Sequence, residues 1–119
     1  MINGGNATIY VSDMDRSVKF YTEALGLKLD YQAGSDWAQI NAGKGLLLGL
    51  HGIAHGAEAG KNGSTTVGFE VDESIERVYD TLKGRGVAFD GPVMDTGHVK
   101  LANFRDPDGN AFYLSETKA

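Results

Sequence analysis

The histidines are the first side chains in this 119-residue chain that could hold a metal or move a proton. His51 and His55 are four residues apart, a spacing that brings two metal ligands together when the segment is helical. Their context, LHGIAHG, instead leaves a predicted strand and enters a Gly-rich stretch, so we interpret the pair as loop residues. His51 alone continues the alternation of Leu47 and Gly49, so its ring could lie on the same face of that strand as these two residues.

His98 and Glu70 are the other candidates for proton transfer or metal binding. His98 shares one face of the predicted strand 98–104 with Lys100, and both side chains could line a pocket or face solvent. Glu70 is the only carboxylate on the face opposite the apolar residues in the strands predicted to open the two halves of the chain. It could accept a proton or act as an alternative metal ligand with a histidine, or it could be an ordinary exposed residue at a strand end.

Three aromatic side chains are candidates for ligand contact. Trp37 and Gln39 alternate with the apolar Ala38 and Ile40, which puts the indole on the opposite face of its strand from these two. A half-buried tryptophan can simply fill the core. Together with Tyr10 and Tyr113, however, it could form a stacking surface for a planar ligand.

The elements that must position these side chains occur twice along the chain. Residues 7–31 and 67–91 share one layout at a constant offset of sixty positions, which pairs Gly26 with Gly86 and Asp30 with Asp90. Each copy opens with strict apolar alternation, typical of a strand, and continues with helical spacing that ends at the paired glycine. Three short strand candidates follow each helix, at about 27–31, 36–41 and 45–51, then at about 87–90, 98–104 and 111–116. The sequence therefore predicts an α+β fold of two β-α-β-β-β modules.

Local signals mark where the helices begin and where the last hairpin turns. The turn is FRDPDGN at 104–110, in which Asp106 and Asp108 can accept backbone N–H groups and Gly109 can take a positive φ. The helix starts carry side chains that can cap an N-terminus: Asp13 or Asp15 in the first copy, and Asp72 or Ser74 in the second.

Size and charge narrow the functional classes. With 41% hydrophobic residues the chain can bury one core, so we expect a single domain over residues 1–119. Within it we expect module one at about 5–51, a Gly- and Ala-rich connection at 52–65, and module two at about 66–116. A net charge of -5 with scattered Lys and Arg disfavours nucleic acid. No apolar run is long enough for a membrane helix, and the chain has no cysteine, so we expect a cytoplasmic protein with no membrane partner.

Two segments resemble a known family. The stretch ATIYVSDMDRSVKFYTEALGLKL, and FRDPDGN followed by a strand, are similar to the vicinal oxygen chelate superfamily, which includes glyoxalase I, fosfomycin and bleomycin resistance proteins and extradiol dioxygenases. The resemblance covers nearly the whole chain. It implies that the two modules form an incomplete barrel with a concave groove, commonly in a homodimer. The groove would be lined from the opening strands by Asn6, Thr8, Tyr10, Thr66, Gly68 and Glu70.

The same resemblance implies where metal ligands would be, and this chain departs from it there. Metal-dependent members carry His or Gln on the first strand of each module and Glu on the last. The corresponding residues here are Asn6, Thr66, Tyr113, and either Leu47 or Gly49. A divalent cation needs several converging N and O donors with carboxylate to balance its charge, which this set does not supply. We therefore expect no metal and no cofactor, and glyoxalase-type isomerisation is disfavoured.

The sequence thus predicts a glyoxalase- and bleomycin-resistance-like protein that binds a small planar or cationic molecule in a concave groove, as in antibiotic resistance by sequestration. The alternative is a metal-dependent lyase, isomerase or dioxygenase with displaced ligands such as His51, Glu70 or His98. A third interpretation is a subunit or sensor module whose groove its partner fills. The predicted ligand-binding residues are Asn6, Thr8, Tyr10, Trp37, Gln39, His51, Thr66, Glu70, His98 and Tyr113.

Overall fold

The structure is a computed structural model that describes Met1, residues 5–52 and residues 66–118. The chain divides into two compact units, Met1–Lys61 and Asn62–Ala119, and each is described by itself. His55 and residues 53–65 of the predicted connection lie outside the described residues. No helix in the described part of the chain is long and apolar enough to cross a membrane.

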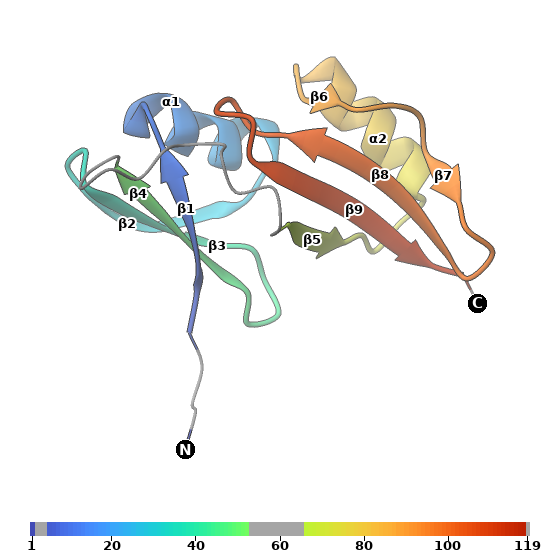
Figure 1. The fold of residues 1–119 in the computed structure, drawn as a ribbon, viewed down its shortest axis with the longest axis horizontal. Helices are drawn as coiled ribbons and strands as arrows, with labels where there is room; N and C mark the ends of the chain where they lie inside the picture. The colour runs from blue at the N-terminus through green and yellow to red at the C-terminus, as the bar shows by residue number, and fades with distance from the viewer. Residues whose placement is uncertain (2–4, 53–65, 119) are drawn as a thin grey trace. The chain divides into compact units, whose positions relative to one another are not determined.

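The first unit is a four-stranded sheet with a helical segment against one face (Figure 1). The strand order is β1-β4-β3-β2, and β1 is parallel to β4 while the other neighbours are antiparallel. Its elements are β1 (Ala7–Val11), α1 (Met14–Lys19), the π-helix η1 (Phe20–Ala24), β2 (Lys28–Ala33), β3 (Trp37–Asn41) and β4 (Leu47–Gly52).

Alternation along β1 decides which side chains enter the core of the first unit. Ile9 and Val11 are buried, whereas Thr8 and Tyr10 between them are exposed. The helix begins as predicted, since the Asp13 side chain accepts a hydrogen bond from the N–H of Arg16. The core is completed by Met14, Tyr21, Ala38, Ile40, Leu48 and Leu50.

The second unit repeats this plan with one additional strand. Its sheet order is β5-β9-β8-β6, with β7 also paired to β8, and α2 packs against one face (Figure 1). The ring centroid of Phe112 lies 5.4 Å from that of Phe69 and 5.5 Å from that of Phe104, so stacked rings form the centre of this core. The elements are β5 (Val67–Glu70), α2 (Ile75–Gly84), β6 (Ala88–Phe89), β7 (Met94–Asp95), β8 (Val99–Arg105) and β9 (Ala111–Thr117).

The predicted α+β fold of two β-α-β-β-β modules is confirmed, with two local differences. The first helix changes to π-helical geometry at Phe20. The strand predicted at 87–90 covers only Ala88–Phe89, and β7 was not predicted. Pro92 explains the break, because proline has no N–H to donate to a strand ladder.

The predicted turn between β8 and β9 is confirmed at Asp106 and Gly109. Asp106 is buried, and its carboxylate accepts the backbone N–H groups of Asp108 at 3.0 Å and Asn110 at 2.8 Å, together with the Asn110 side-chain amide at 2.8 Å. Gly109 has a φ of 87°, a left-handed conformation that glycine adopts readily. One carboxylate therefore organises the whole turn.

Candidate ligand-binding surfaces

Each sheet has one face against its helix and one face away from it, which we call the open face of that unit. In the first unit, the register places Tyr10 beside His51 and His51 beside Trp37. The next row across the same open face joins Thr8, Gly49, Gln39 and Tyr31. Five of the predicted binding residues are thus brought together on adjoining strands: Thr8, Tyr10, Trp37, Gln39 and His51.

The rings of this open face contact one another, and we call Tyr10, Tyr31, Trp37 and His51 the aromatic platform. The His51 ring centroid lies 5.3 Å from that of Tyr10 and 6.0 Å from that of Trp37, the latter edge-on at 88°. The indole Nε1 of Trp37 donates to the Tyr31 hydroxyl at 3.1 Å. The platform therefore presents several ring surfaces in one connected group.

The His51 ring is also oriented by the backbone. Its Nδ1 lies 2.6 Å from the carbonyl oxygen of Gly52, and because a carbonyl only accepts, Nδ1 must carry the donated proton. Neutral His51 therefore keeps Nε2 as an acceptor. This is the nitrogen that remains for a ligand.

Tyr31 was missed by the sequence analysis because of a β-bulge. Leu29 pairs with Ile40 on the helix side, and simple alternation would have put Tyr31 on that side too. The register instead shifts between Leu29 and Tyr31, so that Tyr31 pairs with Gln39 on the open face. Asp30, the extra residue, accepts a hydrogen bond from the Gln39 amide at 3.0 Å.

Gly49 allows the indole to cross its strand. A β-carbon built at Gly49 would come within 2.2 Å of Cη2 and 2.7 Å of Cζ2 of Trp37. The six-membered ring thus occupies the space that any larger residue at position 49 would need. Trp37 is half-buried by this contact and faces away from the core.

The open face of the second unit has a similar arrangement built from other strands. Tyr113 of β9 pairs with Gly68 of β5 and with Asn103 of β8. A β-carbon at Gly68 would lie 2.2 Å from Cζ and 2.5 Å from the hydroxyl oxygen of Tyr113. Glu70, exposed at the end of β5, pairs with Ser115 and so shares the face of the phenol ring.

The remaining predicted residues lie at strand ends. Asn6 is exposed just before β1 and accepts a hydrogen bond from the Thr8 hydroxyl at 2.9 Å. The Thr66 hydroxyl donates to the carbonyl of Ala111 at 3.0 Å. His98 is exposed in the bend before β8, while Lys100 on that strand reaches α2 on the helix-covered side.

The donors at the family's metal-ligand positions do not fit a divalent cation. The oxygen atoms of Asn6 and Thr66 are engaged in local hydrogen bonds, Gly49 has no side chain, and Leu47 is apolar. Tyr113 brings a phenol hydroxyl and no carboxylate to balance the charge of a cation. Among the described residues, no three His, Asp or Glu side chains are grouped so that they could hold a metal.

The chain matches known proteins over nearly its whole length. The model of the Glyoxalase/Bleomycin resistance protein/Dioxygenase superfamily matches residues 5–114. YetH of Bacillus subtilis (strain 168) is 30% identical over 94% of this chain and 96% of its own. Lactoylglutathione lyase of Oryza sativa subsp. japonica is 29% identical over 89% of this chain, which spans only 44% of that enzyme.

A solved structure of a binding protein is similar in both fold and size. TnmS3, an antibiotic binding protein from Streptomyces sp. CB03234, superposes with a TM-score of 0.82 at 28% identity. The match covers 99% of this chain and 98% of TnmS3.

Proposed function

The chain belongs to the Glyoxalase/Bleomycin resistance protein/Dioxygenase superfamily, and we propose that within it the chain is a binding protein for a small planar aromatic molecule. The ligand would stack on the open faces and be released chemically unchanged. Its binding would not need the metal that the enzymes of the family use. This is the sequestration mode of antibiotic resistance. A positive charge on the ligand would add to its affinity.

One observation carries this proposal: aromatic rings that lie over glycines of neighbouring strands stand at or beside the positions where metal-dependent relatives would carry metal ligands. Tyr113 stands where a metal-dependent relative would carry Glu, and its ring extends over Gly68. In the first unit, Trp37 extends over Gly49 in the same way. Such rings offer apolar area and a π face to a flat ligand, which favours stacking over coordination.

Charge supports a ligand that is neutral or cationic. The chain carries a net charge of -5, and Glu70 adds a carboxylate beside Tyr113 on the open face. Long-range attraction would then raise the association rate of a cation and lower that of an anion. The likeness to the antibiotic binding protein TnmS3 over nearly all of both chains supports a small-molecule ligand such as an antibiotic.

Intrinsic fluorescence provides the test, because Trp37 is the single tryptophan. We would titrate the protein with planar polycyclic antibiotics and with bleomycin, and follow both Trp37 emission and the melting temperature. A true ligand quenches Trp37 saturably and raises the melting temperature. Failure of every planar compound to do either, with the protein folded, would sink the proposal.

Tyr113→Ala separates a binding role from a core role. Loss of the ring should weaken ligand binding by roughly 1–3 kcal/mol, the value of burying an aromatic surface, while the fold is retained. Tyr113→Phe is the matched control, because it keeps the ring and removes only the hydroxyl. Unfolding of Tyr113→Ala without a separate effect on the ligand would show that the ring belongs to the core.

A second candidate is a metal-dependent lyase, isomerase or dioxygenase, favoured by the 29% identity to rice lactoylglutathione lyase. It would need displaced ligands such as His51, Glu70 or His98. Elemental analysis of protein purified without chelator decides between the two. Stoichiometric metal in the wild type that is lost in His51→Ala or Glu70→Gln would favour the enzyme. The homodimer and the cytoplasmic location stay predictions from the sequence.

A further inference from the structure

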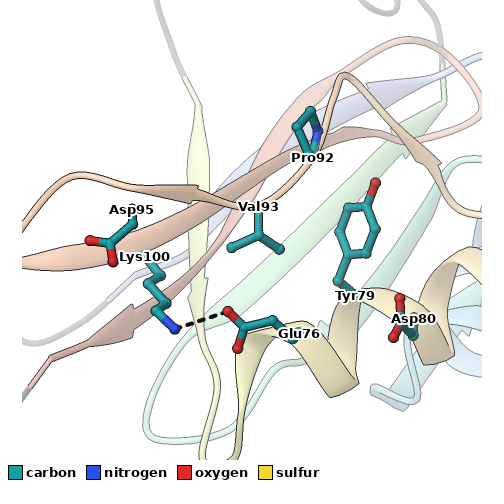
Figure 2. Close-up of a pocket in the computed structure, with 7 residues that line it drawn as sticks. All are labelled: Glu76, Tyr79, Asp80, Pro92, Val93, Asp95 and Lys100. Atoms are coloured by element: carbon teal, nitrogen blue, oxygen red, sulfur yellow. Dashed lines mark hydrogen bonds and ion pairs between the residues drawn. The ribbon is translucent and has the colours of Figure 1, made fainter.

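A hollow lies on the helix-covered side of the second sheet, between α2, β7 and β8 (Figure 2). Its volume is about 430 Å³, within the range of roughly 300–1,000 Å³ that small-molecule sites occupy. Glu76, Tyr79 and Asp80 line it from α2, and Pro92 and Val93 from the segment before β7. The walls are thus partly apolar and the rim is charged.

The hollow forms at an interruption of the β6–β8 ladder, at the repeat position where the first unit has a one-residue bulge in β2. Asp30 is a single extra residue in β2, and its repeat equivalent is Asp90. Phe89 pairs with Phe104 and Met94 with Leu101, so residues 90–93 stand against only residues 102–103 of β8. Asp90 still donates its N–H to the Asn103 carbonyl at 2.8 Å, whereas Pro92 and Val93 leave the ladder and line the hollow.

This hollow is separate from the open face of the same sheet. Lys100 lines it and reaches across to Glu76 of α2 (Figure 2). The side chains of Leu101 and Asn103 point to the opposite face of β8 from Lys100. Asn103 pairs with Tyr113 there, so this is the open face. A molecule in the hollow would therefore not touch Tyr113 or Gly68.

Hydrogen bonds hold the lining in place before any ligand arrives. Lys100 Nζ lies 3.0 Å from Glu76 Oε2, and the Tyr79 hydroxyl donates to the Gly91 carbonyl at 3.1 Å. The bond from Lys100 is the main cause that lowers the pKa of Glu76, so this carboxylate stays ionised at neutral pH. Asp95 at the other end is held by Lys118 at 2.9 Å. Preorganised walls of this kind reduce the entropy cost of binding.

Asp80 is the charged group of the lining that remains uncommitted. Lys100 is matched by Glu76 and Lys118 by Asp95, whereas the Asp80 carboxylate has no hydrogen-bond or ion-pair partner among the described residues. The Tyr79 ring already has a cation near it, since Lys83 Nζ lies 5.6 Å from its centroid. An ammonium group in the hollow could accordingly be paired by Asp80, with Lys83 as a competing cation at the Tyr79 ring.

From this geometry we propose that the hollow binds a small organic cation: a primary ammonium paired with Asp80, on an apolar body that contacts Val93, Pro92 and Tyr79. The site is independent of the open faces and of the function proposed for them. Because Lys83 and Lys100 are close, the affinity is modest, with a dissociation constant on the order of 1–10 mM for a fragment of about ten heavy atoms.

Amide-resolved NMR of the full chain tests this proposal with 2-phenylethylammonium as the probe. Saturable shifts are expected at the amides of Tyr79, Asp80, Val93 and Asp95. The neutral analogue 2-phenylethanol, which matches the probe in shape, should bind more weakly. No saturation by the ammonium, or shifts confined to open-face amides such as those of His51 and Tyr113, would overturn the proposal.

Asp80→Asn tests the carboxylate itself, and Glu73→Gln is the matched control. Both residues are exposed and both changes raise the net charge by one, but only Asp80 lines the hollow. Asp80→Asn should raise the dissociation constant about threefold to fivefold, as for an exposed ion pair, and Glu73→Gln should change it little. An equal effect of the two variants would mean that the probe senses overall charge, which contradicts a site at Asp80.

Discussion

Gly49→Ala is the sharpest test of how the aromatic platform is built. Gly49 is buried in β4, and its φ is not in the left-handed region, so alanine suits the backbone at this position. The obstacle is the indole alone, which a new β-carbon would approach to 2.2 Å at Cη2. Because ordinary carbon contacts are about 3.5–4.0 Å, the ring must move outward by about 1.5 Å.

The magnitude follows from what that displacement breaks. The ring is held by the hydrogen bond from its Nε1 to Tyr31 at 3.1 Å and by its edge contact with His51. Forcing an extra methyl into such a contact costs about 1–3 kcal/mol. Replacing a strand glycine by alanine returns about 0.5–1 kcal/mol through the entropy of the unfolded chain. The difference between these two ranges spans about 0–2.5 kcal/mol, so we expect Gly49→Ala to lower the free energy of unfolding by roughly 1 kcal/mol.

A double-mutant cycle with Trp37→Ala isolates the contact, measured by urea denaturation followed by circular dichroism. In the Trp37→Ala background the obstacle is gone, so Gly49→Ala should become neutral or stabilising, and the sign of its effect should reverse. In the wild-type background, Trp37 emission should also shift to longer wavelength as the ring moves into water. The same loss of stability in both backgrounds would refute the account of Gly49 as the residue that admits the indole.

Two further predictions concern charged side chains of the second unit. Asp106→Ala should lower the free energy of unfolding by about 2–4 kcal/mol, because three N–H donors of the β8–β9 turn lose a buried charged acceptor. Asp106→Asn should lower it by less. Urea denaturation of both variants measures the two changes. The lowered pKa of Glu76 means that its contribution to stability is present above its ordinary value of 4.5 and is lost as the pH falls through the lowered value. Lys100→Met should raise the pKa of Glu76 towards 4.5 in a carbon-detected NMR titration, and the control Lys83→Met should leave it unchanged. If Lys100→Met did not change the pKa of Glu76, the hydrogen bond from Lys100 would be excluded as the cause of the lowered pKa.

The fold could be predicted from the sequence because its signals are local and occur twice. The cap at Asp13, the positive φ of Gly26 and Gly86, and the Asp106 turn all depend on residues a few positions apart. The offset of sixty positions then fixed the module plan, because two weak patterns that agree are stronger evidence than one.

The parts that could not be predicted depend on departures from period two. A single bulge moved Tyr31 to the open face, and the interruption near Pro92 produced β7 and the hollow beside α2. Alternation assigns a face only while the register is unbroken, and the sequence does not state where an extra residue leaves the ladder. The acidic residue at the same repeat position, Asp30 and Asp90, is a signal that could have located both breaks.

The two units reach a similar open face by different substitutions, and this links Tyr113 to Gly68. Thr8 pairs with Gly49 in the first unit, and Gly68 pairs with Tyr113 in the second, so Gly49 and Tyr113 are structural equivalents. The ring comes from β3 in one unit and from β9 in the other, yet each crosses a glycine on a neighbouring strand. Glycine at 68 lets the phenol of Tyr113 lie where it does, since a β-carbon there would come within 2.2 Å of its Cζ and the ring would have to move. We expect Tyr113→Glu to remove a ring fitted to its neighbour without creating a metal site, because Gly49 has no side chain and Thr66 offers only a hydroxyl.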